Sequence, residues 1–401
     1  MRWPGWVASA LVVAGCAVPV ATGPESVESF VARHWRQPLA PQGPAPARFS
    51  PLEASLEPEA CGTCHPAQLA DWQTSTHAAA MGPGVSGQLI EMLATDPRGA
   101  LACQHCHAPL AEQAPLRRDT LAENPDFDPA LRRRGIPCAG CHVRGHERFG
   151  PPRRDGSLAS AAPRETLPHG GVTRTPAYLR SEFCRDCHQF APDGYALAGK
   201  LLEDTYNEWK ASRFAAAGVQ CQDCHMPDRR HLWRGIHDPE TVRRGLTISV
   251  VEDATPGGGR VAGRLIVDST GVGHRFPTYV TPIVVLRGEL IDADGRVVAG
   301  TREERRIGRE VTLDLERELS DTRLRPGERA ELVYGRALEG GAVAARFSVV
   351  VYPDAFYTAF YETLLRQGAG RGEPEIRAAL DDARRSAFSV FESTIRPRSA
   401  R

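Results

Sequence analysis

Ten of the 11 cysteines in this 401-residue chain stand in one short pattern that could hold a metal cofactor. The pattern is C-x-x-C-H, and its copies are CGTCH at 61–65, CQHCH at 103–107, CAGCH at 138–142, CRDCH at 184–188 and CQDCH at 221–225. With 11 cysteines and 13 histidines, composition alone gives on the order of 0.01 copies per chain. Five copies therefore indicate a chemical function.

Two thiols and an imidazole at this spacing form the attachment pattern of c-type haem. The thiols add across the two vinyl groups of the porphyrin, and the adjacent histidine binds the iron. Zinc ribbons would not need a histidine after every second cysteine. A thioredoxin-like pair would need a βαβ context around one motif, and structural disulfides would not repeat this spacing. We therefore predict five covalently attached haem c groups. The predicted cofactor-binding residues, whose histidines are the proximal iron ligands, are Cys61, Cys64, His65, Cys103, Cys106, His107, Cys138, Cys141, His142, Cys184, Cys187, His188, Cys221, Cys224 and His225.

The iron of a carrier haem usually takes a second axial side chain, most often histidine or methionine. Eight histidines remain outside the motif-terminal positions, whereas the chain has only four methionines in all. Histidine is therefore the expected second ligand. The candidates from position alone are His169, in the loop sequence LPHGG, and His231 and His237, just after the last motif. We do not expect His34, His105 or His146 to bind iron.

Five segments together resemble the bacterial multihaem cytochromes c of the cytochrome c-552/4 type, which are related to the hydroxylamine oxidoreductase and pentahaem nitrite reductase lineage. They are CGTCHPAQLADWQTSTHAAAM, GIPCAGCHVRGHERFGPP, SEFCRDCHQF, GVQCQDCHMP and GVGHRFPT. The resemblance runs from about Pro51 to the C-terminal region. It implies that His77, in the W-x-x-S-x-H segment, and His274, in the GHRFP turn, are further distal ligands. Helical spacing agrees, because Trp72 and Thr76 would share one face and leave His77 on the next turn. The alternatives are a surface position for His77 and a purely packing role for the turn.

The first sixteen residues, MRWPGWVASALVVAGC, are typical of an export signal. Their apolar run is too short to span a bilayer. The closing VAGC resembles the bacterial lipoprotein processing box, and Cys16 is the one cysteine outside the motifs. We therefore expect Cys16 to be acylated, with each buried methylene of the acyl chains contributing about 0.8 kcal/mol to membrane anchoring. The alternative is an ordinary signal peptide. Either form places the protein outside the cytoplasm, in the periplasm or at the outer membrane.

The composition and the hydrophobic pattern change along the chain, and together they predict an α + β fold. Residues 1–16 form the signal, and 17–55, rich in proline and alanine, read as a tether. Residues 56–244 lack long apolar runs, so the predicted haems must supply their core. Residues 245–353 carry alternating β-branched runs such as RVAGRLIVDST and RFSVVVYP, which predict an antiparallel β-sandwich. Residues 354–401 read as C-terminal helices and a tail, including PEIRAALDDARRSAFSVFES.

These features predict a pentahaem lipoprotein that carries electrons between a donor and an acceptor, each a redox protein or quinol-linked. Lys+Arg and Asp+Glu balance at 49 each, which argues against a nucleic-acid partner. The alternative is an oxidoreductase acting on a small inorganic nitrogen or sulfur compound at one open-coordinate haem. Relatives that reduce nitrite have lysine in one attachment motif, whereas all five motifs here end in histidine, which weakens that reading. No catalytic side chain is predicted.

Overall fold

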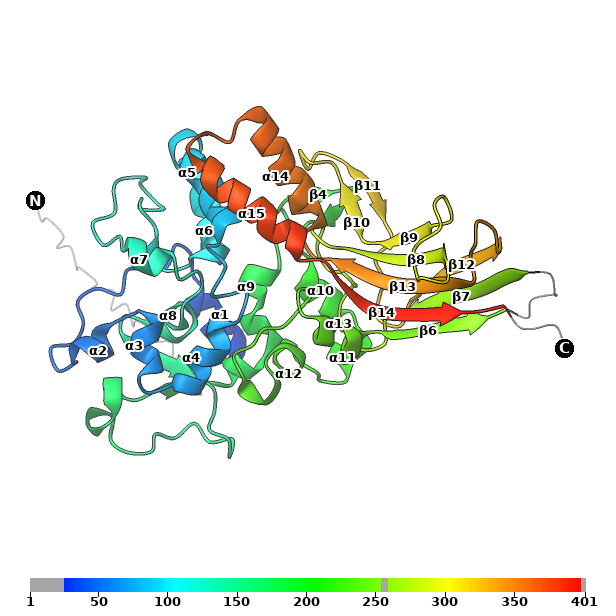
Figure 1. The fold of residues 1–401 in the computed structure, drawn as a ribbon. Coiled ribbons are helices and arrows are strands. Elements are labelled where there is room, and N and C mark those ends of the chain that lie inside the picture. The colour runs from blue at the N-terminus through cyan, green and yellow to red at the C-terminus, as the bar shows by residue number, and fades with distance from the viewer. Residues whose placement is uncertain (1–24, 254–258, 398–401) are drawn as a thin grey trace, which may run out of the picture.

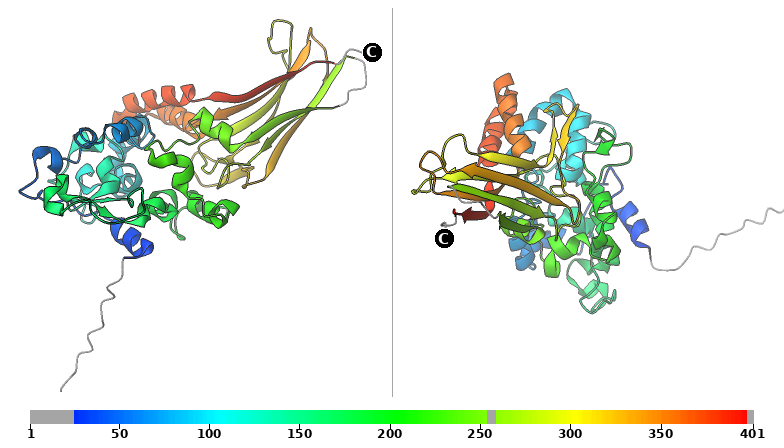
Figure 2. Two further views of the ribbon diagram at one scale, coloured as in Figure 1. Left: turned by 90° about the horizontal axis from the view of Figure 1, so that it is seen from below. Right: turned by 90° about the vertical axis from the view of Figure 1, so that its right-hand side faces the viewer.

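The computed structural model describes residues 25–253 and 259–397, and it divides into two parts (Figure 1). Short helices and loops at one end hold all five motifs, and two antiparallel sheets extend away from them (Figure 2). We call residues 26–245 the motif domain, and the two sheets the β domain. The α + β fold expected from the sequence is confirmed. Signal residues 1–16, with Cys16, lie outside the described residues.

The motif domain is built from short helices, many of which begin with proline. Proline fits the first turn of a helix, where its missing N–H is not needed, but it interrupts a longer one. The helices are α1 (Val27–His34), α2 (Pro51–Ala54), α3 (Pro58–Gly62), α4 (Pro66–Gln73), α5 (Pro83–Thr95), α6 (Pro97–His107), α7 (Pro129–Arg132), α8 (Cys138–His142), α9 (Arg185–His188), α10 (Thr205–Lys210), α11 (Arg213–Ala216), α12 (Cys221–His225) and α13 (Pro239–Gly245). Short strands β1 (Val143–Arg144), β2 (Glu147–Gly150), β3 (Thr173–Arg174), β4 (Ala196–Leu197) and β5 (Lys200–Leu201), with several 3₁₀ turns, complete it.

Helix α1 corrects the prediction that residues 17–55 are a tether. Its N-cap Ser26 accepts a hydrogen bond from the Ser29 amide, and Phe30 and Val31 are buried. Both side chains pack in one apolar cluster with Phe149 and Phe183. The aromatic and aliphatic residues of this helix share one face, so burying that face offsets the entropy of ordering the segment. From α1 onward the chain is therefore part of the motif domain.

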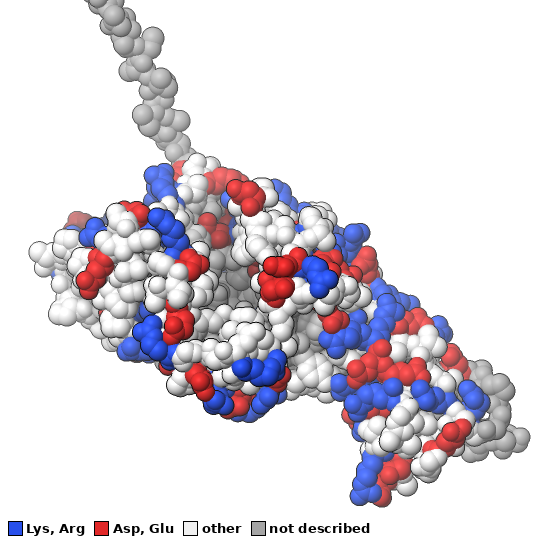
Figure 3. Space-filling view, turned by 90° about the horizontal axis from the view of Figure 1, so that it is seen from above, with Lys and Arg blue, Asp and Glu red and all other residues white. Residues whose placement is uncertain are grey.

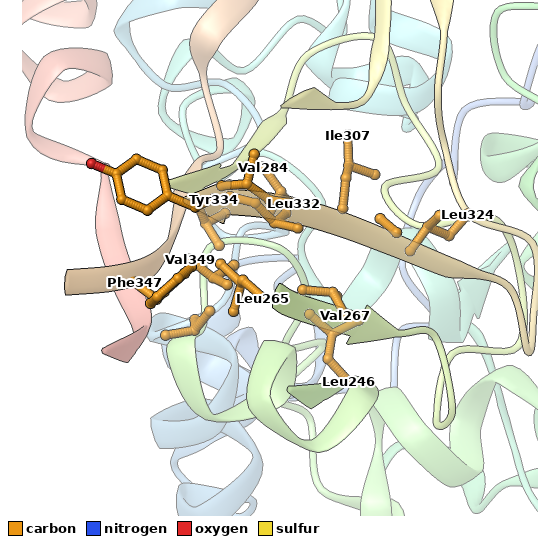
Figure 4. Packing of buried hydrophobic residues seen from close by; sticks show 14 of the residues in the cluster. Leu246, Leu265, Val267, Val284, Ile307, Leu324, Leu332, Tyr334, Phe347 and Val349 are labelled. Carbon is orange, nitrogen blue, oxygen red and sulfur yellow. The ribbon is translucent and has the colours of Figure 1, made fainter. Parts of the chain in front are cut away.

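The β domain is a two-sheet sandwich, as predicted. One sheet has the strand order β14-β13-β8-β9 and the other β12-β7-β6, with every neighbouring pair antiparallel. The strands are β6 (Thr247–Glu252), β7 (Arg260–Asp268), β8 (Ile283–Ile291), β9 (Glu303–Ile307), β12 (Arg329–Ala337), β13 (Ala344–Tyr352) and β14 (Phe388–Ile395). Alternate side chains of facing strands meet between the sheets, including Leu265, Leu332 and Phe347 (Figure 4).

A glycine lets the largest of these side chains fit. Gly288 on β8 lies under the ring of Tyr334, where an added Cβ would stand 2.7 Å from the ring carbons. Tyr334 is 1% exposed, and its hydroxyl donates to the Thr301 carbonyl at 2.8 Å. The buried phenol is therefore satisfied as well as packed.

Two helices connect the domains, and the chain then returns to the sandwich. Helix α14 (Ala355–Gln367) packs on α15 (Glu373–Arg385), which also contacts α5 of the motif domain (Figure 1). The helix predicted over PEIRAALDDARRSAFSVFES ends at Arg385, and its last residues form β14 instead. The stretch contains Phe388, Val390 and Phe391, aromatic and β-branched residues that favour strands, and the open edge of β13 pairs with it. The end of the predicted helix is thus a strand.

A second contact between the domains centres on one buried arginine. Arg309 begins β10 (Arg309–Val311), which pairs with β11 (Glu318–Asp321), and its side chain is fully buried. The guanidinium donates to the carbonyls of Leu197, Lys200 and Leu201 in the β4–β5 hairpin, at 2.6–3.0 Å. Its Nε donates to Glu318 at 2.9 Å. This contact fixes the β10–β11 hairpin on the motif domain.

Charged side chains of both signs are interspersed over both domains on the face shown in Figure 3. That face carries no extended patch of one sign, in keeping with the balanced composition. Within residues 25–253 and 259–397, no helix is long and apolar enough to cross a membrane.

Candidate haem-binding sites

Each motif folds as a short helical turn, which brings its three functional side chains together. The third and fifth motifs are complete helices, α8 and α12, and the second motif is the last turn of α6. Residues three and four apart lie on one face of a helix. The two thiols and the imidazole of a motif therefore point to the same side, as covalent haem attachment requires. Among the described residues, none of the ten motif cysteines forms a disulfide.

Four motif histidines are held through the ring nitrogen Nδ1. His107, His142 and His225 bond the backbone carbonyls of Ala80, Phe149 and Arg234, at 2.7, 2.8 and 2.6 Å. His188 bonds the hydroxyl of Tyr279 at 2.8 Å. A metal-binding histidine characteristically uses one ring nitrogen in this way, which fixes the ring and leaves Nε2 for the metal.

Three motif histidines face a second imidazole. The ring centres of His142 and His231 are 6.2 Å apart. The corresponding distance is 6.3 Å for His188 with His77 and for His225 with His274. A metal held between two imidazoles, with about 2.0 Å to each nitrogen, separates the ring centres by about 6.3 Å. The three pairs therefore fit iron with an axial histidine on each side.

Burial keeps four of these imidazoles neutral. It lowers the pKa of His77 to about 3, and that of His142, His188 and His274 to about 4 in each case. A neutral imidazole has the lone pair that a metal needs, whereas imidazolium does not. The ring nitrogens are therefore ready to bind iron without first losing a proton.

The motifs also touch one another. The side chains of Cys61 and Cys138, of Cys106 and Cys187, and of Cys184 and Cys221 lie close enough to interact. The first motif thus contacts the third, and the fourth contacts both the second and the fifth. Cofactors attached at these positions must lie side by side.

Comparison with known proteins agrees with this arrangement. The family model described as cytochrome c554 and c-prime matches residues 60–143. The fold resembles the crystal structure of a penta-heme cytochrome c552 from Thermochromatium tepidum, with a TM-score of 0.60 at 18% identity, over 86% of this chain and 100% of that one. No curated protein matches the sequence. Residues 60–143 thus match a cytochrome c family, and the chain as a whole has the fold of a penta-heme cytochrome c. Both findings support the multihaem cytochrome c resemblance noted in the sequence, and with it haem c as the cofactor.

Long-range contacts place the histidines that face the motif histidines. The helical spacing of the sequence predicts that the helix continues as far as His77. In the structure helix α4 ends at Gln73, so His77 lies in the turn after the helix. Trp72 is buried and donates from Nε1 to the Ile136 carbonyl at 2.8 Å, and the Ile136 amide donates to the His77 carbonyl. The segment after the fifth motif is tied to α4 by the pair Arg230–Asp71, at 2.6 Å. These bonds set His77 and His231 opposite their motif histidines.

Two predicted distal ligands are placed differently. His169 bonds the Gly171 carbonyl through Nδ1 at 3.1 Å, and its charge interacts with His65. It stays a candidate for the first motif. His237 is 45% exposed, and its Nε2 lies 3.1 Å from both carboxylate oxygens of Asp354. The structure pairs His237 with that carboxylate and not with a motif histidine, because α14 brings Asp354 beside it.

The three histidines that were not expected to bind iron all use Nε2 elsewhere. His34 and His146 bond the carbonyls of Cys141 and Gly43, at 2.8 and 2.9 Å, and His105 bonds the Asp186 carboxylate at 2.8 Å. Sequence reasoning missed a different residue, Tyr279, which holds the ring of His188 from 91 residues away. No local pattern marks it, since only the fold brings it there.

Replacing His274 by alanine should convert one low-spin haem centre of the purified holoprotein to high spin. The iron of His225 would lose the imidazole that faces it, and water binds iron too weakly to keep the low-spin state. EPR of the oxidised protein measures this change. The matched variant His237→Ala should leave the spectrum unchanged, because that ring faces Asp354. A low-spin spectrum retained in His274→Ala would remove His274 from the ligand set.

Proposed function

We propose that this cytochrome carries electrons through five covalently bound haems at the cell envelope. Haem iron supplies the chemistry, which is a reversible change of one electron. The protein supplies the ligands, the spacing and the surroundings. The observation that carries the proposal is the set of paired imidazoles, because an iron held on both sides has no free position for a substrate.

The residues of each site have defined roles in this proposal. The ten motif cysteines attach the cofactors, and the five motif histidines are the proximal ligands. His231, His77 and His274 complete the coordination opposite His142, His188 and His225, at the ring separations given above. His169 is the proposed partner of His65.

The contacts between motifs support a carrier. The third motif also adjoins the fourth, because Cys141 and Cys184 lie close enough for their side chains to interact. This contact adds to the contacts between motif cysteines described above. All five attachment sites therefore form one connected set, with the fourth site adjacent to the second, third and fifth. A carrier that accepts an electron at one surface and releases it at another needs such a set.

We also propose that the protein is exported and anchored through an acylated Cys16. Helix α1, the first described helix, packs on the motif domain and not on the β domain. An anchor ahead of α1 would therefore hold the motif domain close to the membrane. The expected donor and acceptor are redox proteins or quinol-linked enzymes that reach this domain.

One observation favours the alternative, an oxidoreductase for a small inorganic nitrogen or sulfur compound. Within the described part of the chain, the ring of His107 is not in contact with a second imidazole. Its Nδ1 bonds the Ala80 carbonyl, and the adjoining residue Met81 belongs to an apolar cluster. An iron bound by His107 is thus the one to examine for an open position.

A haem count and a spin-state measurement test the carrier proposal. We expect the pyridine haemochrome assay to give five haems per chain, because all five motifs are complete. EPR of the oxidised protein should show low-spin centres for the irons of the three paired histidines, His142, His188 and His225. A high-spin centre whose visible spectrum changes when carbon monoxide or nitric oxide is added would instead support the oxidoreductase. Fewer than five haems would contradict the proposed cofactor number.

A further inference from the structure

The proximal ring of the fourth motif is held differently from the others. His107, His142 and His225 bond backbone carbonyls, which cannot gain or lose a proton. His188 bonds a side-chain hydroxyl, that of Tyr279. A hydroxyl can accept one hydrogen bond and donate another, so it can pass polarisation onward.

The hydrogen bonds continue from Tyr279 to a carboxylate. The side chain of Tyr279 interacts with that of Thr205. The Thr205 hydroxyl donates to Oε1 of Glu203 at 2.8 Å and also lies 2.8 Å from the Thr278 hydroxyl, from which it can accept. With Nε2 of His188 on iron, its Nδ1 carries the proton and must donate. Every donor then points the same way, from His188 through Tyr279 and Thr205 to Glu203. The carboxylate is the final acceptor of the chain.

The surroundings of Glu203 make its charge easy to change. Burial raises the pKa of Glu203 to about 8, and the hydrogen bond from Thr205 only partly opposes this. The charged groups that face it are Cys106 on α6 and Glu208 on α10, and both disfavour ionisation. Glu208 is itself paired with Arg323 at 3.1 Å. Once Cys106 is a thioether it carries no charge, so burial and Glu208 remain.

We propose that Glu203 is a redox-linked proton site, connected by Thr205 and Tyr279 to the iron that His188 binds. The inference rests on the proposed electron-carrier function. Reduction of that centre by one electron from the redox partner is accompanied by binding of one proton from water to the Glu203 carboxylate. On oxidation the electron returns to the redox partner and the proton returns to water, and no bond to iron forms or breaks.

The sign of the coupling follows from the direction of the hydrogen bonds. An ionised Glu203 strengthens each hydrogen bond of the chain that leads to it. The His188 imidazole then donates more electron density to the iron, which favours the ferric state. A protonated Glu203 weakens that pull and favours ferrous iron. Because linkage is reciprocal, reduction must also increase the affinity of Glu203 for a proton. The midpoint potential of this centre should therefore fall as pH rises.

Potentiometric titrations of the purified holoprotein, followed by visible spectra and EPR from about pH 6 to about pH 9, test this coupling. We expect one centre whose reduction constant changes by up to tenfold per pH unit, about 59 mV for one electron. Glu203→Gln should abolish that dependence at this centre and leave the other centres unchanged. Tyr279→Phe should also abolish it, although Glu203 is still present.

Asp204→Asn is the matched control. Asp204 is the adjacent carboxylate, and it bonds Gln189 and Asn207 outside the chain of hydrogen bonds. It should keep the pH dependence. An unchanged slope in both Glu203→Gln and Tyr279→Phe would overturn the inference, as would its loss in Asp204→Asn. Infrared difference spectra give a second readout, since a protonated carboxyl band should appear on reduction and be absent in Glu203→Gln. Haem counts in every variant keep this test separate, because a missing haem contradicts the proposed function instead.

Discussion

The chain made without haem should lose the structure of its motif domain while the β domain stays folded. The β domain has its own core, a cluster of twenty buried apolar residues that includes Leu265, Phe347 and Val349. The motif domain has only separate small clusters, of six, five and four buried residues. Such clusters cannot offset the entropy of ordering about two hundred residues. Cofactor binding must therefore supply the missing free energy, as it does in small metal-bound domains.

Hydrogen exchange measured by mass spectrometry checks this expectation. The exported chain from a host that attaches haem is compared with the same chain made in a cytoplasm that cannot. In the haem-free chain we expect fast exchange at α8, α9 and α12, and slow exchange at β8 and β13. The β strands serve as the internal control. Equal protection of the motif helices in both forms would show that side chains alone build that domain.

Arg309→Ala should lower the free energy of unfolding of the holoprotein by about 3–5 kcal/mol, the range for breaking a buried ion pair. The guanidinium is fully buried, and its removal leaves three carbonyls of the β4–β5 hairpin without their donor. In the variant, Glu318 would still form its ion pair with Lys200, at 2.6 Å. The lost stability therefore comes mainly from the hydrogen bonds between Arg309 and the motif domain. A lysine cannot reproduce the planar fork of donors, so Arg309→Lys should also be destabilising.

Urea unfolding followed by circular dichroism measures the loss. The matched control is Arg306→Ala, three residues earlier, whose side chain is 49% exposed and pairs with Glu310. An exposed pair of this kind contributes about 0.2–1 kcal/mol. If Arg309→Ala proved no more destabilising than Arg306→Ala, the buried contact would not be what holds the β10–β11 hairpin on the motif domain.

Local patterns predicted the attachment chemistry and the fold class well. A C-x-x-C-H turn needs only its own five residues to bring two thiols and an imidazole to one side, so its geometry follows from spacing. Alternating β-branched residues likewise predicted the strands of the sandwich, because each strand has one face between the sheets. The errors fell where a local pattern was ambiguous. Residues 27–34 were predicted as part of a tether, but they form helix α1, whose apolar face is buried. Residues 388–395 were predicted mainly as helix, but they pair with the edge of β13 as a strand.

The sequence by itself determined the attachment sites, because haem attachment is chemistry between neighbouring residues. Only the tertiary structure decided which histidine faces which motif. His77 and His188 are distant in the sequence, and so are His142 and His231, and packing of α4 against the later segments brings them together. Packing likewise sends His237 to Asp354 and brings Tyr279 to His188. Such pairings depend on the whole path of the chain, and no short pattern of residues encodes them.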